Sequence, residues 1–243
     1  GGAARVVLDN TYGTRALRAP VVEVAKRHDV PVRCLVAATT LEQAQTNAAA
    51  RMLELHGRLL EPAELRKLQM IAPNAQFRYR REYEPPRADE GFAAIEDVAF
   101  SRRSSPGKRA LLVELDDLVW KGRPRGPAEV QLVPGIREHL VRWHDAGFVL
   151  AGTTWLTPPA LDAALGALLG VPIAIARCLH PPGPPVCWCR KPLPGLALLL
   201  ARDLKLDLSD SVHVGKGPAD RGFALRANLA YADIADGFPS PGG

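Results

Sequence analysis

The sequence has 243 residues, of which 47% are hydrophobic and 23% are charged, a balance typical of a globular protein rather than a disordered one. The formal net charge is +5 and arginine is far more frequent than lysine, which suits phosphate-bearing partners but does not by itself indicate nucleic acid. No segment is long and apolar enough to span a bilayer and no signal peptide is evident, so we expect a cytoplasmic protein. The chain opens on Gly-Gly-Ala-Ala-Arg without an initiator Met, which suggests a piece of something longer.

The first hundred residues alternate between strand-like and helix-like segments. An apolar run at residues 4–9 predicts a buried strand, a helix follows from about 14 to 28, and residues 31–37 predict a second strand. A capping-box pattern at residues 40–43 begins a helix that continues to about 55, and Glu61-Pro62 begins another. Regular alternation of strand and helix favours a parallel, doubly wound sheet.

A polar, basic stretch at residues 101–108 contains a Pro-Gly break and is the best candidate for a linker. Strand and helix then alternate again, with predicted strands at 110–115, 148–151, 172–176 and 211–214 and predicted helices at 134–146, 158–169 and 194–204. We therefore predict an α/β protein with two three-layer α/β/α units. The predicted domains are residues 1–100 and 110–238, joined by a linker at 101–109.

Three of the four cysteines lie within one twelve-residue segment, in a chain without a secretion signal, which favours metal binding over disulfides. Cys178 and His180 form one pair, and Cys187 and Cys189 form a second pair after six intervening residues, four of which are proline. Three thiolates and one imidazole form a tetrahedral ligand set that zinc accepts, and a site closed by four protein ligands is structural. The alternative is a group of reduced cysteines without a metal. Cys34, on an apolar strand, is predicted to be a small core residue.

The run Cys-x-Cys-Arg-Lys-Pro at residues 187–192 resembles the zinc-containing phosphatases of the haloacid dehalogenase (HAD) superfamily, such as histidinol-phosphate and heptose-bisphosphate phosphatases. In that family a strand ends in Asp-x-Asp-x-Thr, whose first Asp is the nucleophile and a magnesium ligand and whose second is the general acid and base. The resemblance places Glu114 at the nucleophile position and Asp116 at the acid and base position, while Leu118 replaces the Thr.

The remaining HAD motifs also have counterparts. Thr154, or alternatively Thr153, matches the hydroxyl residue that binds the transferred phosphoryl group, and Lys191 matches the lysine that neutralises its charge. The last motif, Gly-Asp-x-x-x-Asp, completes the magnesium site. Here it reads Gly-Lys-Gly-Pro-Ala-Asp, so that Lys216 replaces the first acid and Asp220 retains the second.

These two departures from the motifs weaken the expected chemistry. A Glu nucleophile displaces the attacking oxygen by about one methylene, and a misplacement of about 1 Å can reduce the rate about a hundredfold. Lys216 introduces a cation where magnesium needs an acid, so we expect it to repel the metal and to pair with Glu114 and Asp116 instead. Lys191 and Lys216 together could hold a phosphate without turning it over.

The N-terminal part resembles the end of the kinase domain in polynucleotide kinase 3′-phosphatases. The resemblance is carried by Val7–Thr11, Val30–Leu35, Leu41–Ala44 with Asn47, and Glu90–Ile95. Those kinases are P-loop proteins, but no Gly-x₄-Gly-Lys-Ser/Thr loop occurs in these residues. Arg51 matches one lid arginine of the family, or is a surface residue of its helix.

From these features we expect a degenerate phosphatase related to polynucleotide kinase–phosphatases. It would contain structural zinc and would bind phosphate or nucleic-acid ends with weak or no hydrolysis. The alternatives are an active magnesium-dependent phosphatase, acting on polynucleotide 3′-phosphates or a small phosphomonoester, and a structural or regulatory subunit with a protein partner.

Overall fold

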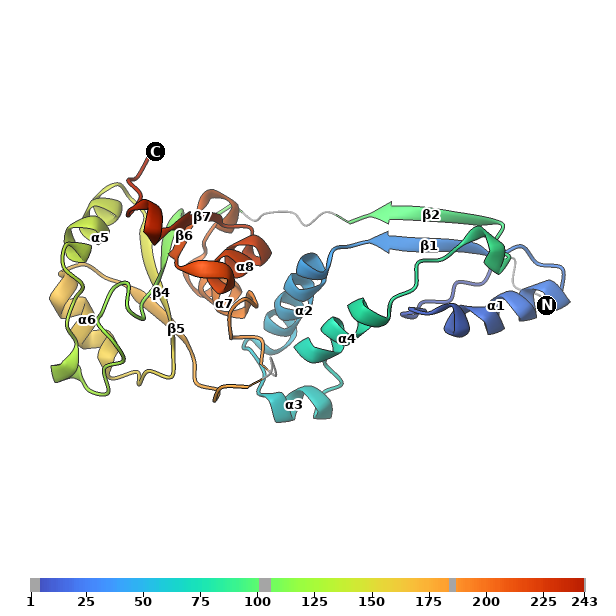
Figure 1. Ribbon diagram of the computed structural model, residues 1–243, viewed down its shortest axis with the longest axis horizontal. Coiled ribbons are helices and arrows are strands. Elements are labelled where there is room, and N and C mark those ends of the chain that lie inside the picture. Colours follow the sequence, from blue (N-terminus) through green and yellow to red (C-terminus); the bar gives the residue numbers. More distant parts are fainter. Residues whose placement is uncertain (1–4, 101–105, 184–186, 243) are drawn as a thin grey trace. The chain divides into compact units, whose positions relative to one another are not determined.

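The computed structural model describes residues 5–100, 106–183 and 187–242. The chain divides into two compact units (Figure 1). The first consists of residues 1–40 and 75–101, and the second of residues 41–74 and 102–243. Most of the predicted linker lies outside the described residues, as do Pro184 and Pro185 of the predicted zinc loop.

The first unit contains a parallel pair of strands, β1 (Arg33–Ala38) and β2 (Ala94–Ala99), which are aligned with Arg33 opposite Ala94. Its helices are α1 (Arg15–Arg27), the short η1 (Ala88–Glu90) and most of α4 (Pro73–Glu82).

The buried Arg18 guanidinium connects the parts of the first unit. It forms a two-pronged ion pair with Glu90, with both N–O distances 2.8 Å, and donates to the carbonyls of Tyr12 and Glu84. The Arg18 side chain therefore bonds to the segment before α1 through Tyr12 and to the segment after α4 through Glu84 and Glu90.

The buried strand predicted at residues 4–9 is wrong for the described residues 5–9, which form no strand. Val6 and Val7 are 73% and 78% exposed, and Leu8 is also exposed. A strand needs a hydrogen-bonded neighbour to satisfy its backbone groups, and in the described part of the chain this segment has none.

The second unit is built on five parallel strands in the order β5-β4-β3-β6-β7. Their bounds are β3 Ala110–Glu114, β4 Val149–Trp155, β5 Ala174–Cys178, β6 Val212–Gly215 and β7 Ala230–Asp233. All five residues of β3 are buried, as expected for a central strand that is covered on both faces.

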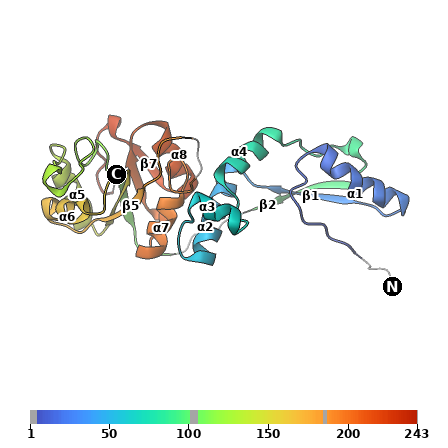
Figure 2. The same cartoon turned by 90° about the horizontal axis from the view of Figure 1, so that it is seen from below.

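Helices cover both faces of this sheet (Figures 1 and 2). On one face, Leu111 and Val113 of β3 pack in a core with α5 (Ile136–Asp145) and α6 (Leu161–Leu169). On the other face, Ala110 and Leu112 pack with α7 (Gly195–Leu204) and α8 (Gly217–Ala227). The alternation follows from the two-residue period of a strand, and it confirms the predicted α/β class with parallel sheets.

Residues 41–74 belong to the second unit, which differs from the predicted division near residue 100. Helix α2 (Leu41–His56) packs against α7 and α8, and α3 (Pro62–Lys67) follows it. Ala49, Met52 and Leu53 of α2 form a core with Leu193, which precedes α7, and with Leu198 of α7. These contacts join residues far apart in the sequence, so a composition change at the linker cannot reveal them.

Helices α4 and α8 and strand β7 were not predicted individually from the sequence. Helix α8 begins beside Lys216 with Gly217 and Pro218, a pattern that resembles a turn, and β7 is a four-residue edge strand that ends in Asp233. In the described residues no helix has the length and apolar character that a membrane crossing requires.

Candidate functional site

The predicted site residues meet at the carboxyl ends of β3, β4 and β6. Strand β3 is central. From it the chain adds β4 and β5 on one side and then β6 and β7 on the other, so the strand order reverses between β3 and β6. A crevice outside the carboxyl ends of strands at such a reversal is the usual ligand site of an open α/β sheet. Glu114 is the last residue of β3 and Gly215 the last of β6.

Lys191 connects two buried carboxylates at this edge. Its Nζ donates to Glu114 Oε2 and, at 2.5 Å, to Asp220 Oδ1. The side chains of Lys191, Glu114 and Asp220 are 13%, 12% and 6% exposed, so the ammonium group bridges two carboxyl groups that water scarcely reaches. Lys191 therefore lies next to Glu114, the residue predicted at the nucleophile position.

Three groups lie within hydrogen-bonding distance of the Asp220 carboxylate. His213 Nε2 lies 2.9 Å from Oδ1, Lys191 donates to the same oxygen, and the Lys216 backbone N–H donates to Oδ2 at 2.9 Å. A Cβ atom at Gly215 would lie 2.4 Å from the Asp220 carboxyl carbon. Glycine is therefore required at the end of β6 so that the carboxylate can approach the strand closely.

Asp116 lies in the turn after β3 and is equally well ordered by hydrogen bonds. Thr154 Oγ1 and Trp120 Nε1 donate to its Oδ1 at 2.8 and 3.2 Å, and the Trp155 backbone N–H donates to Oδ2 at 3.1 Å. The Asp116 backbone N–H itself donates to Glu114 Oε1 at 3.2 Å. Thr154, rather than Thr153, faces this carboxylate, since Thr153 Oγ1 is buried without a partner among the described residues.

Lys216 does not pair with Glu114 or with the Asp116 carboxylate, and the expectation that it would is wrong. Its Nζ donates to the Asp116 backbone carbonyl at 3.2 Å and lies 3.5 Å from Asp117 Oδ2. Glu114 accepts from Lys191 instead, and the carboxylate of Asp116 accepts from Thr154 and from the Trp155 backbone. Lys216 therefore lies at the exposed rim of the site.

The buried groups of the site differ in protonation. Burial raises the pKa of Glu114 to about 7, although Lys191 favours the ionised form. Burial also opposes ionisation of Asp220, but His213 and Lys191 outweigh it and hold the pKa of Asp220 well below its usual range. Burial lowers the pKa of His213 to about 4. At neutral pH Asp220 is thus ionised, His213 is neutral, and Glu114 is close to half-protonated.

The two lysines leave a poor site for magnesium. Mg²⁺ prefers oxygen ligands in octahedral geometry, and carboxylate and carbonyl oxygens are present. However, an ammonium group already bonds to Glu114 and Asp220, and a second one bonds to the Asp116 carbonyl. A divalent cation would have to displace at least one of these groups, so the residues present do not fit magnesium as they are arranged.

The predicted metal ligands Cys178, His180, Cys187 and Cys189 do come together, with all four ligand atoms within 4.8 Å of one another. Cys178 Sγ lies 3.8 Å from Cys187 Sγ and 3.6 Å from His180 Nδ1, and Nδ1 lies 3.1 Å from Cys189 Sγ. Zn–S bonds of about 2.3 Å and Zn–N bonds of about 2.0 Å give tetrahedral edges of about 3.5–3.8 Å. The group could therefore hold a metal ion, and its distances are close to those expected around zinc.

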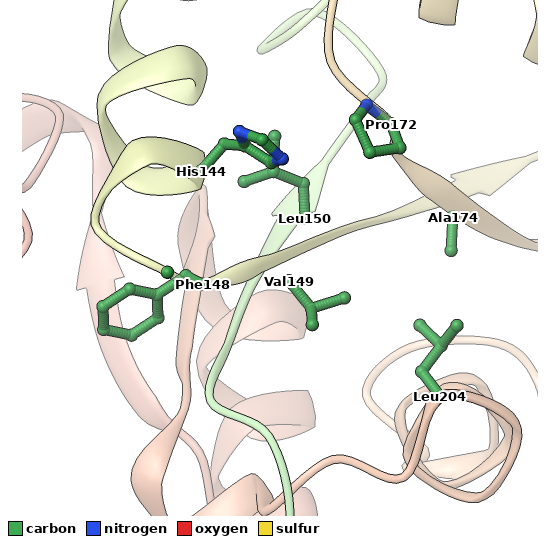
Figure 3. A pocket seen from close by; sticks show the side chains of 8 residues that line it. His144, Phe148, Val149, Leu150, Pro172, Ala174 and Leu204 are labelled. Carbon is green, nitrogen blue, oxygen red and sulfur yellow. The ribbon is translucent and has the colours of Figure 1, made fainter.

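A separate hollow lies at the opposite edge of the sheet (Figure 3). Val149 and Ala174 on its wall are the first residues of β4 and β5, so it opens at the amino ends of the strands, away from the carboxylates. Apart from His144, the labelled side chains that line it are apolar. It offers no cluster of groups for chemistry.

Residues 1–71 match a family model described as an AAA domain, within the part that was predicted to be P-loop-like. The chain is similar to the solved structure of a putative HAD-like phosphatase from Mesorhizobium loti (26% identity, 54% of this chain and 74% of that chain, TM-score 0.45). It is also similar to D,D-heptose 1,7-bisphosphate phosphatase from B. bronchiseptica, complexed with magnesium and phosphate (24% identity, 56% and 90%, TM-score 0.47).

Sequence reasoning missed three groups that contact the site. His213 is a fully buried polar residue in the apolar strand β6, and that contrast was a usable signal. Asp117, beside Asp116, contacts Lys216. Glu61 lies 2.8 Å from His180 Nε2, and since the two are separated by 119 positions no local pattern could have revealed this contact.

Proposed function

We propose that residues 110–238 form a phosphatase-like domain of HAD ancestry that binds a phosphoryl group and hydrolyses it weakly or not at all. The ancestry is supported by the motif residues, which converge on the carboxyl edge of a parallel sheet in the order that the motifs require. The observation that carries the proposal is the Lys191 ammonium between Glu114 and Asp220, with Lys216 beside it.

This arrangement weakens Glu114 as a nucleophile. Its Oε2 is bonded to Lys191, its Oε1 accepts from the Asp116 backbone N–H, and with a pKa of about 7 it is close to half-protonated at neutral pH. An attacking carboxylate needs a free, ionised oxygen in line with the phosphorus. The longer Glu side chain also displaces that oxygen by about 1 Å, and such a shift can reduce the rate about a hundredfold.

The same arrangement favours binding of an anion. Lys191 supplies a positive charge beside Glu114 and Asp220, Lys216 supplies another at the Asp116 carbonyl, and Thr154 presents a hydroxyl group. An anion can draw these ammonium groups from their carboxylates, and protonation of Glu114 removes one competing negative charge. Phosphate would thus be held by the protein's own cations, where a magnesium-dependent phosphatase uses a metal.

For the ligand we propose a phosphorylated nucleic-acid end. Support comes from the strings shared with polynucleotide kinase–phosphatases, from the AAA-domain match over residues 1–71 and from the net charge of +5. The four-ligand Cys and His group would hold a structural zinc, because its geometry is closed by protein ligands.

The test is phosphate release from 3′-phosphorylated oligonucleotides and from small phosphomonoesters, with and without magnesium. For the wild-type chain we expect phosphate release close to background. For the double variant Glu114→Asp with Lys216→Asp we expect an increase of about tenfold or more, because both motif positions then carry aspartate. Lys191→Ala should stay inactive. Rapid magnesium-dependent release by the wild-type chain that is lost in Lys191→Ala would refute the proposal.

One observation favours the second candidate, an active phosphatase. Asp116 is oriented by Thr154, Trp120 and the Trp155 backbone, as a general acid and base must be. In that case Glu114 would attack the phosphorus and break its bond to the alcohol oxygen, which would take a proton from Asp116. Water would then attack the acyl phosphate on Glu114, give a proton back to Asp116 and release phosphate. The magnesium-dependent release just described separates the two candidates.

A further inference from the structure

The orientation of the His180 ring is fixed from both of its nitrogens. Nδ1 faces the sulfurs of Cys178 and Cys189 at 3.6 and 3.1 Å, so this nitrogen is the one that can bind a metal. Nε2 then carries the hydrogen, and it lies 2.8 Å from the Glu61 carboxylate. A metal-bound histidine usually donates its second N–H to a carboxylate or carbonyl, which fixes the ring and raises its basicity.

Glu61 comes from a distant part of the sequence. It lies at the start of α3, and its own backbone N–H is held by Glu64 Oε2 at 2.9 Å. Helix α3 and the preceding α2 belong to residues 41–74, which resemble the end of a kinase domain and pack in the second unit. The carboxylate of Glu61 therefore connects this segment to the metal-ligand loop.

A second contact joins the same two segments. Trp188, between the ligands Cys187 and Cys189, is fully buried in a core with Met52, Leu60 and Leu65. Its indole N–H donates to the Ile71 carbonyl at 3.1 Å. The loop that binds the metal thus presents one ligand to Glu61 and inserts its tryptophan beside α2 and α3.

We propose that Glu61 is the outer partner of the metal-bound His180, and that metal binding fastens residues 41–74 to the phosphatase-like sheet. The metal fixes the four ligands, which in turn fix the ring of His180 and the position of Trp188 between its neighbours. Without the metal, the contacts of Glu61 and Trp188 remain, but no ion joins the three cysteine sulfurs to His180. Glu61 acts here as a positioning residue and is not a ligand.

The first experiment measures zinc affinity of the full chain by competition with a chromophoric chelator. Glu61→Gln keeps the shape of the side chain and removes its charge, and loss of such a partner typically weakens metal affinity about 10- to 100-fold. Because Glu61 is partly exposed, we expect about a tenfold loss. Glu54→Gln, which makes the same change at an exposed position of α2, is the matched control and should bind zinc as the wild-type chain does.

The second experiment follows backbone hydrogen exchange of residues 41–74 before and after zinc is removed by a chelator. We expect faster exchange in α2, α3 and the segment to Ile71 once zinc is removed, while the strands of the sheet keep their protection. Equal zinc affinity in the Glu61 and Glu54 variants, unchanged exchange of residues 41–74, or a chain that binds no zinc would each overturn the proposal. None of these outcomes depends on phosphatase activity.

Discussion

Replacing Lys191 by methionine would leave two buried carboxylates without the ammonium group that bridges them. Methionine retains the length and the apolar stem of lysine, so the change removes mainly charge. Removing one partner of a buried ion pair typically costs about 3–5 kcal/mol of folding free energy, and with side chains only 6–13% exposed we expect Lys191→Met to fall in that range near pH 8.

The same substitution at Lys216 is the matched control. The side chains of Lys216 and Asp117 are 49% and 61% exposed and their charged atoms are 3.5 Å apart. Exposed pairs of this kind contribute about 0–1 kcal/mol. Lys216→Met should therefore leave the free energy of unfolding almost unchanged, although it removes an identical charge from the same site.

The pH dependence gives a sharper test. The pKa of Glu114 is raised to about 7, so its stability contribution is fully present below its unfolded-state pKa and is lost as the pH rises through 7. Lys191 lowers this pKa, so its removal raises it further and extends the loss to higher pH. The cost of Lys191→Met should thus be larger near pH 8 than near pH 5.5, where Glu114 is protonated in both proteins.

Urea unfolding, monitored by tryptophan fluorescence at both pH values, measures these differences. The reasoning fails if Lys191→Met costs no more than Lys216→Met near pH 8. It also fails if the cost of Lys191→Met is independent of pH, because Glu114 would then not be the group left unpaired.

Two further changes test the close approach of Asp220 and the buried pair of the first unit. Gly215→Ala places a Cβ 2.4 Å from the Asp220 carboxyl carbon, so we expect lower thermal stability and weaker binding of inorganic phosphate. Gly126→Ala, where the added carbon has no neighbour within 4 Å, is the control and should bind phosphate as the wild-type chain does. Equal binding by the two variants would contradict this reasoning. Arg18→Met breaks a buried bidentate ion pair and should cost about 3–5 kcal/mol in urea unfolding. The exposed Arg15→Met should leave the free energy of unfolding almost unchanged. Similar costs for the two arginine variants would show that burial of Arg18 is not decisive.

The sequence, through its resemblance to the HAD motifs, predicted which residues would gather at the candidate site. Glu114, Thr154 and Lys216 stand at or just after the ends of apolar runs, and the carboxyl ends of parallel strands meet at one edge of a sheet. The four metal ligands were also recognisable, because their short spacings on one loop restrict where the side chains can lie.

Tertiary packing decided how those residues are paired. Lys191 and Lys216 are equivalent cations in the sequence, yet the buried one bonds to Glu114 and the other lies at the rim. The partner of His180, Glu61, depends on a contact between segments 119 positions apart.

Packing also decided the extent of the second unit and the fate of residues 5–9. Ala49, in the helix predicted from residue 40 to about 55, is fully buried in the core that α2 forms with Leu198 of α7. The apolar run at 5–9 has strand propensity and lacks a neighbouring strand in the described residues, so it stays exposed. Local sequence sets what a segment can form, whereas hydrogen-bond and core partners from distant segments decide whether it forms.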